Sequence, residues 1–312
     1  MEITFTNPSY LWFILVIPLI IFAHFISLRF IRRKALKFAN FPAIEYVTGE
    51  RILSKNYTLL LIRLITIFLL ILAVSGATLW YEAEISDADY VIAIDASGSM
   101  LANDFKPNRL EAAKNSAILF IESVKERSKI GVISFAGISY LKQTLTNDFT
   151  KVKESIKNIS VELVGGTAIG SAIISSVNLL ENSEKAKVLI LLTDGQSNVG
   201  PSVEEALNYA KEKHVTIHTI GIGTEQGGGF PEMNLSFTSK LDEETLKKIA
   251  KETGGNYYYA KTEDEIKNAY EEISTKTKGK LSINLSLIFL ILALILLALE
   301  WILVNTKFRT LP

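Results

Sequence analysis

The chain has 312 residues, of which 48% are hydrophobic, and its 33 basic residues balance its 33 acidic ones, so the formal net charge is zero. This composition excludes a disordered chain and gives no overall positive field to attract nucleic acid, so we expect no nucleic-acid partner. The chain contains no cysteine, which excludes disulfides, zinc–thiolate sites and cysteine nucleophiles.

Three apolar segments are each long enough to cross a lipid bilayer, which takes about 20 residues. They cover residues 10–28, 59–77 and 283–304. The basic residues of the first segment follow it rather than precede it, which favours a retained anchor over a cleaved secretory signal. The sequence therefore predicts a multi-pass protein of the cell (inner) membrane, with an N-terminal membrane region over residues 1–80 and a third transmembrane helix near the C-terminus.

The loop between the first two predicted helices, residues 29–57, is basic. It holds seven basic and two acidic residues: Arg29, Arg32, Arg33, Lys34, Lys37, Arg51 and Lys55 against Glu45 and Glu50. Short cytoplasmic loops of membrane proteins are enriched in lysine and arginine. We therefore expect this loop and the C-terminus in the cytoplasm, and the long segment between the second and third helices outside the cell or in the periplasm.

Residues 84–278 form a predicted domain in which strand-like and helix-like runs alternate. The strand-like runs are short, apolar and rich in β-branched residues, as expected for strands covered on both faces. They cover residues 89–95, 129–135, 186–194, 215–223 and 256–260. Helical patterns cover residues 108–126, 168–182, 202–214, 242–255 and 263–274. The alternation predicts an α/β fold with a doubly wound, mostly parallel sheet, which a long loop or small hairpin at 223–240 interrupts.

Polar side chains follow the strands of this predicted sheet. Asp95, Ser97 and Ser99 come at the end of the first strand, Asp194 ends the third, and Thr167 lies in a glycine-rich loop before a predicted helix. We expect all five at one edge, because ligands bind beyond the carboxyl ends of the strands in such sheets. Two carboxylates and three hydroxyls suit a hard divalent cation such as Mg²⁺ or Mn²⁺. The hydroxyls would bind the cation and the carboxylates its water, which leaves an open position for a carboxylate of another molecule.

Two other interpretations of Asp95 stay open. An aspartate followed by serine and glycine is also the pattern of a simple turn or helix cap. An aspartate after a strand also occurs in phosphoaspartyl enzymes, so the alternative function is a metal-dependent hydrolase or phosphatase with Asp95 at the active site. Ser97 stands where a D-x-D motif has its second carboxylate, which leaves no evident acid–base group beside Asp95 and disfavours catalysis.

Three polar residues interrupt the predicted transmembrane helices: His24, Arg63 and Glu300. Each lies about four residues from the predicted cytoplasmic end of its helix, which is roughly 6 Å at 1.5 Å per residue. Arg63 and Glu300 are candidates for an ion pair, because an unpaired charge in lipid is costly. The alternative is that each side chain extends separately to the nearby headgroups.

The motifs DASGSM (95–100), GGTAIG (165–170) and LLTDG (191–195), in this order, resemble the metal-ion-dependent adhesion site (MIDAS) of von Willebrand factor A domains. Together with the membrane segments, the chain resembles the Bat (BatA/BatB-like, aerotolerance) family. The resemblance implies a von Willebrand factor A-like, Rossmann-type fold and a partner protein that supplies a glutamate or aspartate to the bound Mg²⁺. The implied metal ligands are Asp95, Ser97, Ser99, Thr167 and Asp194.

The resemblance also implies partners beyond this ligand. A MoxR-type AAA+ ATPase and sister Bat proteins are the expected associates, in a stress-tolerance or chaperone-like membrane complex. We expect the ATPase to act through the loop 29–57. The role would then be that of a protein-binding module rather than an enzyme.

Overall fold

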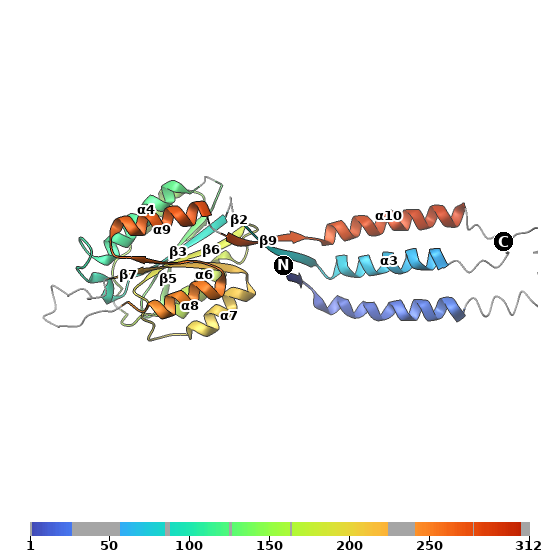
Figure 1. Ribbon diagram of the computed structural model, residues 1–312, viewed down its shortest axis with the longest axis horizontal. Coiled ribbons are helices and arrows are strands. Elements are labelled where there is room, and N and C mark those ends of the chain that lie inside the picture. The colour runs from blue at the N-terminus through green and yellow to red at the C-terminus, as the bar shows by residue number, and fades with distance from the viewer. Residues whose placement is uncertain are drawn as a thin grey trace, which may run out of the picture. The chain divides into compact units, whose positions relative to one another are not determined.

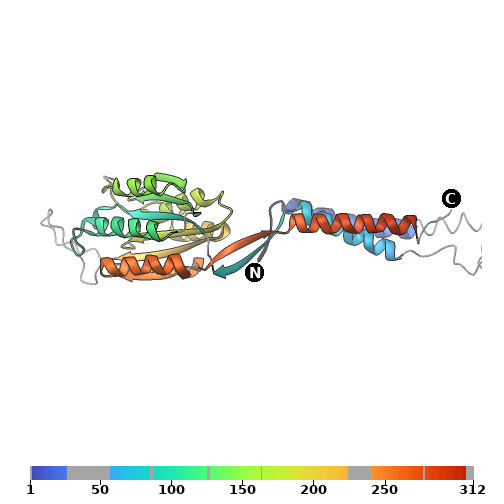
Figure 2. The same cartoon turned by 90° about the horizontal axis from the view of Figure 1, so that it is seen from above.

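The computed structural model describes residues 2–26, 57–84, 88–124, 127–162, 164–223, 241–276 and 278–306. The chain forms two units (Figures 1 and 2): a membrane unit of residues 1–81 and 282–312, and an α/β unit of residues 82–281. Two sequence predictions fall outside the described residues, namely the basic loop 29–57, apart from its last residue, and the loop 223–240, apart from its first.

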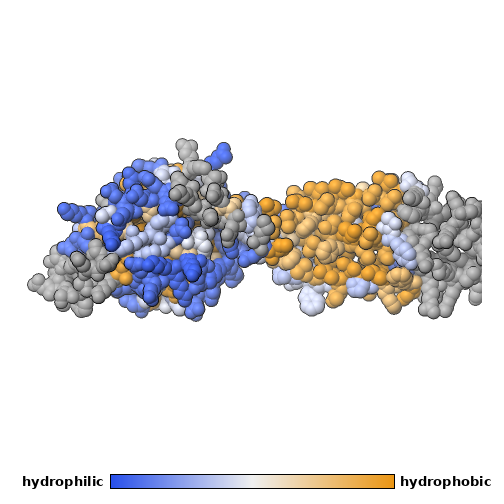
Figure 3. Space-filling view, viewed as in Figure 1, coloured by the Kyte–Doolittle hydropathy of each residue, from blue (hydrophilic) through white to orange (hydrophobic). Residues whose placement is uncertain are grey.

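Three long apolar helices make up most of the membrane unit. The first begins as the 3-10 helix η1 (Pro8–Leu15) and continues to Ile26, the second is α3 (Tyr57–Val74) and the third is α10 (Ser286–Asn305). Each is long and apolar enough to cross a membrane. Large apolar side chains are exposed along all three helices, and Figure 3 shows the resulting hydrophobic surface. The prediction of three such helices is confirmed.

A three-stranded sheet with the order β1-β2-β9 adjoins these helices along the chain. Its strands are β1 (Glu2–Phe5), β2 (Ala77–Glu84) and β9 (Lys278–Asn284). β1 and β2 pair antiparallel, with Glu2 opposite Trp80. Gly76 has φ +73° in the turn between α3 and β2, a left-handed conformation that glycine adopts at little cost. These strands were not predicted from the sequence, and the second helix ends at Val74, before the turn, and not at residue 77 as predicted.

The α/β unit contains a six-stranded sheet with the order β5-β4-β3-β6-β7-β8. The strands are β3 (Ala88–Asp95), β4 (Ile130–Phe135), β5 (Ser139–Thr146), β6 (Ala186–Thr193), β7 (Val215–Ile222) and β8 (Tyr257–Ala260). All neighbours pair in parallel except β5, which is antiparallel to β4 at one edge. The predicted mostly parallel, doubly wound sheet is confirmed, and β5 is the strand that the sequence analysis missed.

Helices cover both faces of this sheet (Figure 1). They are α4 (Arg109–Ser123), α5 (Phe149–Lys157), α6 (Ile169–Leu180), α7 (Val203–Glu212), α8 (Glu243–Thr253) and α9 (Glu263–Lys276). Successive residues of a strand point to opposite faces. Ile92 and Ile94 of β3 therefore join the core with α4, α5 and α9, whereas Val91 and Ala93 join the core with α6, α7 and α8. The central strands are mostly apolar and are buried throughout because both of their faces are covered.

Candidate metal site

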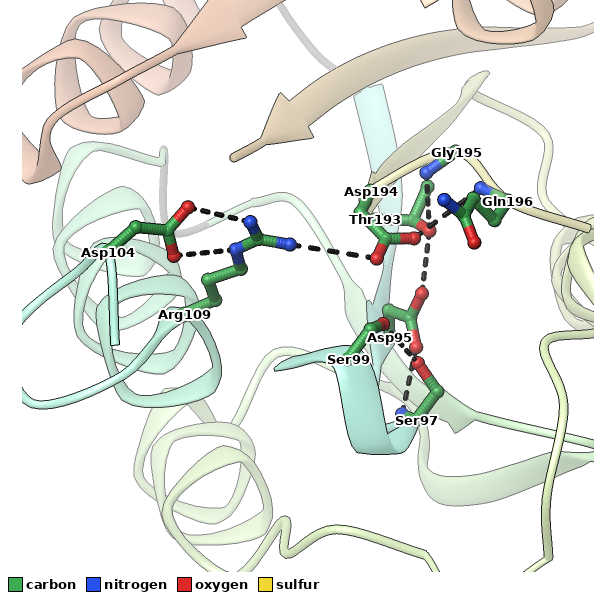
Figure 4. A network of polar contacts seen from close by, with 9 residues as sticks. All are labelled: Asp95, Ser97, Ser99, Asp104, Arg109, Thr193, Asp194, Gly195 and Gln196. Atoms are coloured by element: carbon green, nitrogen blue, oxygen red, sulfur yellow. Dashed lines mark hydrogen bonds and ion pairs between the residues drawn. The ribbon is translucent and has the colours of Figure 1, made fainter. Parts of the chain in front are cut away.

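Two buried carboxylates lie at the carboxyl ends of the two central strands. Asp95 is the last residue of β3, and Asp194 directly follows β6. β3 and β6 are parallel neighbours in register, with Ile94 opposite Leu192. Neither carboxylate residue is accessible to solvent. The structure thus brings both aspartates to one edge of the sheet (Figure 4).

Both oxygens of the Asp95 carboxylate accept hydrogen bonds. The backbone N–H of Ser97 donates to Oδ1 at 2.8 Å, and the hydroxyl of Thr193 donates to Oδ2 at 2.6 Å. Asp95 therefore does close a local turn, as one interpretation of the sequence required. The hydroxyls of Ser97 and Ser99 lie 3.0 Å apart, on either side of the start of the 3-10 helix η2 (Gly98–Leu101), so the turn also groups two hydroxyl oxygens beside the carboxylate.

The site concentrates negative charge in a buried place. Burial, and then the nearby charge of Asp194, raise the pKa of Asp95 to about 7, although the hydrogen bonds from Ser97 and Thr193 oppose this effect. Two carboxylates that interact in this way cannot both ionise freely without a compensating positive charge. The arrangement therefore favours a cation or a proton between them.

A buried arginine lies on the other side of Asp194. Arg109 donates from Nε and Nη2 to the two carboxylate oxygens of Asp104, at 2.7 and 2.6 Å, and its Nη1 lies 3.7 Å from Oδ2 of Asp194. The guanidinium thus lies between two carboxylates, as Figure 4 shows. Its positive charge offsets part of the negative charge at the site, and Oδ2 of Asp194 is the oxygen that faces it.

Sequence reasoning did not identify Arg109 and Asp104 as part of this site. Arg109 is the first residue of α4, and the side chain of Asn108 caps this helix by accepting from the backbone N–H of Glu111 at 2.8 Å. The cap pattern indicates where the helix begins. It gives no sign that the first side chain turns toward Asp194, because that contact depends on the neighbouring strand β6.

Thr167 is fixed against the loop that follows Asp194. Its backbone N–H donates to Oδ1 of Asn198 at 2.8 Å, and its carbonyl oxygen accepts from the backbone N–H of Asn198 at 3.0 Å. Its side chain is nearly buried. The structure thus places all five predicted site residues in loops or strand ends at the same edge of the sheet. Asn198, which positions Thr167, has no signal in the sequence beyond its place after Asp194.

The membrane unit contains the predicted ion pair. Nε and Nη2 of Arg63 donate to Oε1 of Glu300 at 2.9 and 2.6 Å, and the two residues join α3 to α10. Of the two alternatives that the sequence left open for Arg63 and Glu300, the structure shows the ion pair.

Residues 89–272 match the profile of the von Willebrand factor type A domain family, and residues 1–76 match the family described as aerotolerance regulator N-terminal, BatA. Two similar relatives are UPF0353 proteins. The one from Nocardia farcinica is 27% identical over 86% of this chain and 87% of its own, and the one from Mycobacterium leprae is 29% identical over 96% and 95%.

Solved structures show the same fold. BatB of Bacteroides thetaiotaomicron is 29% identical over 60% of this chain and 97% of its own, with a TM-score of 0.54. An aerotolerance-related membrane protein of Bacteroides fragilis is 28% identical over 61% and 98%, with a TM-score of 0.55. Proximal thread matrix protein 1 of the mussel byssus, solved with a zinc-occupied MIDAS motif, is 21% identical over 65% and 50%, with a TM-score of 0.51.

Proposed function

The chain belongs to the von Willebrand factor type A domain family and is a membrane protein of the Bat group. We propose that its α/β unit binds a divalent cation and, through this cation, a carboxylate of a partner protein. The observation that carries this proposal is the grouping of buried Asp95 and Asp194 with serine hydroxyls at the carboxyl edge of the sheet.

The donor set fits a hard cation. Carboxylate and hydroxyl oxygens are the ligands that Mg²⁺ and Mn²⁺ prefer, and Mg²⁺ usually keeps several waters. In our proposal Ser97, Ser99 and Thr167 supply hydroxyl ligands, while Asp95 and Asp194 accept hydrogen bonds from the waters. The mussel protein of the same fold holds zinc in its MIDAS motif, which supports the choice of a divalent ion for this chain.

The charges of the site also favour a cation. Burial, and then the charge of Asp194, raise the pKa of Asp95 to about 7, and a bound dication would offset both effects by stabilising the ionised carboxylates. Arg109 offsets part of the charge of Asp194, so the cation would keep some of its Lewis acidity. That remaining acidity is what an external carboxylate oxygen would satisfy.

The groups that contact Asp95 support a role in binding rather than in catalysis. Its described hydrogen-bond partners are a backbone N–H and a threonine hydroxyl, neither of which exchanges a proton near neutral pH as a general acid or base would. The protein is therefore proposed as a binding module and not an enzyme. Hydrolysis of p-nitrophenyl phosphate by the wild type, lost in Asp95→Ala, would favour the alternative of a metal-dependent phosphatase.

The test of cation binding compares unfolding temperatures of the full chain in detergent, in Mg²⁺ and in EDTA. A ligand that binds only the folded state raises its stability. We expect Mg²⁺ to raise the unfolding temperature of the wild type and to have no effect on Asp95→Ala. The matched control is Asp148→Ala, which removes an exposed carboxylate that caps α5 and should keep the response. Equal responses of the wild type and Asp95→Ala would reject the proposed site.

Partner binding is tested by detergent pull-down with mass spectrometry, using the wild type and Asp95→Ala, each in Mg²⁺ and in EDTA. Partners lost both in EDTA and in Asp95→Ala would be ligands of the cation. Sister Bat proteins are the first candidates, in keeping with a stress-tolerance or chaperone-like complex. A MoxR-type AAA+ ATPase is instead proposed to bind the basic loop 29–57, so its recovery should depend on that loop and not on Mg²⁺.

The proposed topology places the loop 29–57 and the C-terminus in the cytoplasm and the α/β unit outside or in the periplasm. The chain has no cysteine, so a single introduced cysteine can be labelled without background. We expect a membrane-impermeant maleimide to label Glu212→Cys in intact cells or spheroplasts, and Lys37→Cys only after lysis. Glu212 is exposed on α7. The reverse labelling pattern would invert the topology.

A further inference from the structure

Apolar side chains are exposed at the same edge of the α/β unit as the candidate metal site. In the described part of residues 82–281, six large apolar side chains are exposed: Leu101, Leu119, Ile138, Leu141, Val164 and Val199. Four of the six lie in loops that begin at or near the site residues. Leu101 ends η2, which follows Ser97, Ile138 follows β4, Val164 precedes Thr167, and Val199 follows Asp194. Their exposure is 41%, 50%, 43% and 40%.

These loops contact one another. The backbone N–H of Gly137 donates to the carbonyl oxygen of Val164 at 3.3 Å, which joins the loop of Ile138 to the loop of Thr167. A Cβ added at Gly166 would lie 2.9 Å from Cγ2 of Val199, so the Val199 side chain packs beside the glycine that precedes Thr167. The four apolar side chains, here called the apolar rim, therefore flank the residues that are proposed to hold the cation.

The loops that carry the apolar rim have no charged side chain. Residues 96–103, 136–139, 164–168 and 195–201 contain no aspartate, glutamate, lysine, arginine or histidine. Of the charged side chains next to these loops, Lys142 pairs with Glu162 at 2.8 Å, Asp104 pairs with Arg109 at 2.6 Å, and Lys106 is a single exposed lysine. The described residues at this edge therefore form no row of basic groups that would attract a strongly acidic ligand.

We infer that the ligand of this site is a single glutamate or aspartate with apolar neighbours, on an exposed segment of a partner protein, and not an acidic tract. The inference rests on the proposed function, because the carboxylate is the group that the cation would bind. The apolar rim would bury the neighbouring side chains, which removes apolar surface from water on both partners. Additional acidic residues would gain no ion pair in these loops and would lose water, so they weaken binding.

This chemistry predicts a weak dependence on salt. Attraction between exposed charges is screened over roughly 8 Å at physiological ionic strength, and the rim has no such charges. A site that recognised an acidic tract through surface lysines would lose affinity steeply as salt rises. The ligand inferred here should bind nearly equally well in low and moderate salt.

The experiment uses the full chain in detergent and fluorescent nonapeptides, with affinity measured by fluorescence anisotropy in Mg²⁺ and in EDTA. Four peptides share one frame and differ at or around the central residue. The three central residues are Leu-Glu-Val in the first peptide, Ser-Glu-Ser in the second, Asp-Glu-Asp in the third and Leu-Gln-Val in the fourth. We expect the first to bind about tenfold more tightly than the second, since burying two aliphatic side chains is worth at least that factor. The third should be weaker still, and the fourth should not respond to Mg²⁺.

Two pairs of rim variants locate the effect. Val164→Ser with Val199→Ser, and separately Leu101→Ser with Ile138→Ser, should each reduce the advantage of the leucine-flanked over the serine-flanked peptide. The Mg²⁺-dependent rise in unfolding temperature reports in each variant that the cation still binds. The matched control is Leu119→Ser with Leu141→Ser, which alters the two exposed apolar side chains outside the rim and should keep the full advantage.

The outcomes separate this inference from the proposed function. Mg²⁺-dependent binding with equal or greater affinity for the serine-flanked or aspartate-flanked peptide would overturn the inference and leave the cation site intact. Binding of the leucine-flanked peptide that persists in EDTA, or no Mg²⁺-dependent binding of any peptide, would overturn the proposed function and the inference together.

Discussion

The membrane unit and the α/β unit each place an arginine against a carboxylate in apolar surroundings. In the membrane unit, Nη2 of Arg63 lies 2.6 Å from Oε1 of Glu300, and the Arg63 side chain is 52% exposed on the surface of the unit. In the α/β unit, Arg109 is fully buried, 2.6 Å from Asp104 and 3.7 Å from Asp194. The two contacts have the same chemistry and nearly the same length, but they differ in what surrounds them.

This difference decides what each arginine does. Arg109 is enclosed by protein, so its loss would leave two buried carboxylates without their positive charge. Arg63 lies at the outer surface of its unit and has a long flexible side chain. This side chain can therefore extend toward lipid headgroups if Glu300 is absent. The buried pair is thus part of the fold and of the site, whereas the exposed pair connects two helices that already pack against each other.

The largest loss of stability is expected when the buried arginine, Arg109, is removed. Arg109→Ala should lower the free energy of unfolding of the α/β unit by about 3–5 kcal/mol, the usual cost of removing one member of a buried ion pair. Urea unfolding followed by far-UV circular dichroism measures this loss. All three tryptophans, Trp12, Trp80 and Trp301, lie in the membrane unit, so tryptophan fluorescence reports that unit separately and should be unchanged.

The matched control for Arg109 is Lys153→Ala in the same unit. It removes a lysine that pairs with Glu122 at the surface, where such a pair contributes about 0–1 kcal/mol. Similar losses in the two variants would show that burial does not distinguish the two arginines as we argue.

The second effect concerns a buried ionisable group without an opposite charge. Burial lowers the pKa of His218 in β7 to about 4, and its Nδ1 accepts from the backbone N–H of Asn256 at 3.1 Å. The unfolded chain has an ordinary histidine pKa near 6.5 and so binds the proton first. Stability is therefore complete above about pH 6.5 and decreases as the pH falls, by about 3 kcal/mol at pH 4.

Unfolding measured between pH 7 and pH 4 tests this dependence. His218→Asn, whose carbonyl oxygen can replace Nδ1 as the acceptor, should remove most of this acid-induced loss. An identical decrease in the variant would assign the acid sensitivity to other groups.

The ion pair of Arg63 and Glu300 in the membrane unit should contribute less to stability. A double-mutant cycle with Arg63→Gln and Glu300→Gln should yield a coupling energy of about 1–2 kcal/mol, the scale of polar contacts between membrane helices. Fluorescence of Trp301, next to Glu300, follows the unfolding of the membrane unit in detergent. Additive effects of the two substitutions would mean that the pair contributes nothing to holding α3 against α10.

The smallest effect is expected at the cap that begins the helix of Arg109. Asn108→Ala removes the acceptor for the backbone N–H of Glu111 and should destabilise the α/β unit by about 0.5–1 kcal/mol. Asn108→Asp keeps an acceptor and adds a negative charge at the helix N-terminus, so it should retain the stability. Equal losses in both variants, measured by urea unfolding, would show that the cap does not stabilise α4.

The parts of the fold that were predicted from the sequence are those with a strong local pattern. The four central strands are mostly apolar because both faces are covered, and the three long helices are apolar over nearly all of their length. β5 was missed because its sequence, SYLKQTLT, mixes polar and apolar residues on a half-buried edge. β1 was missed because its four residues acquire strand structure from β2, a distant partner in the chain.

The residues of the candidate site also fall into those that a local sequence pattern predicts and those that it does not. Asp95 and Asp194 each end an apolar strand, so their common edge follows from the sheet type, and Thr167 follows from its glycine-rich motif. Asp104 and Arg109 carry no such pattern. Arg109 joins Asp104 to Asp194, and this bridge depends on how the start of α4 lies relative to the end of β6, which no spacing in the sequence encodes.

The continuity of the α/β unit has a consequence for the order of events during synthesis. Residues 82–281 leave the ribosome as one stretch, and domains generally fold as units while the chain is being made. The membrane unit must instead wait for residues 282–312, which contain α10 and come after the whole α/β unit. Arg63 and Glu300 are 237 positions apart. Arg63 is therefore inserted early and meets its carboxylate only after the whole α/β unit has been made.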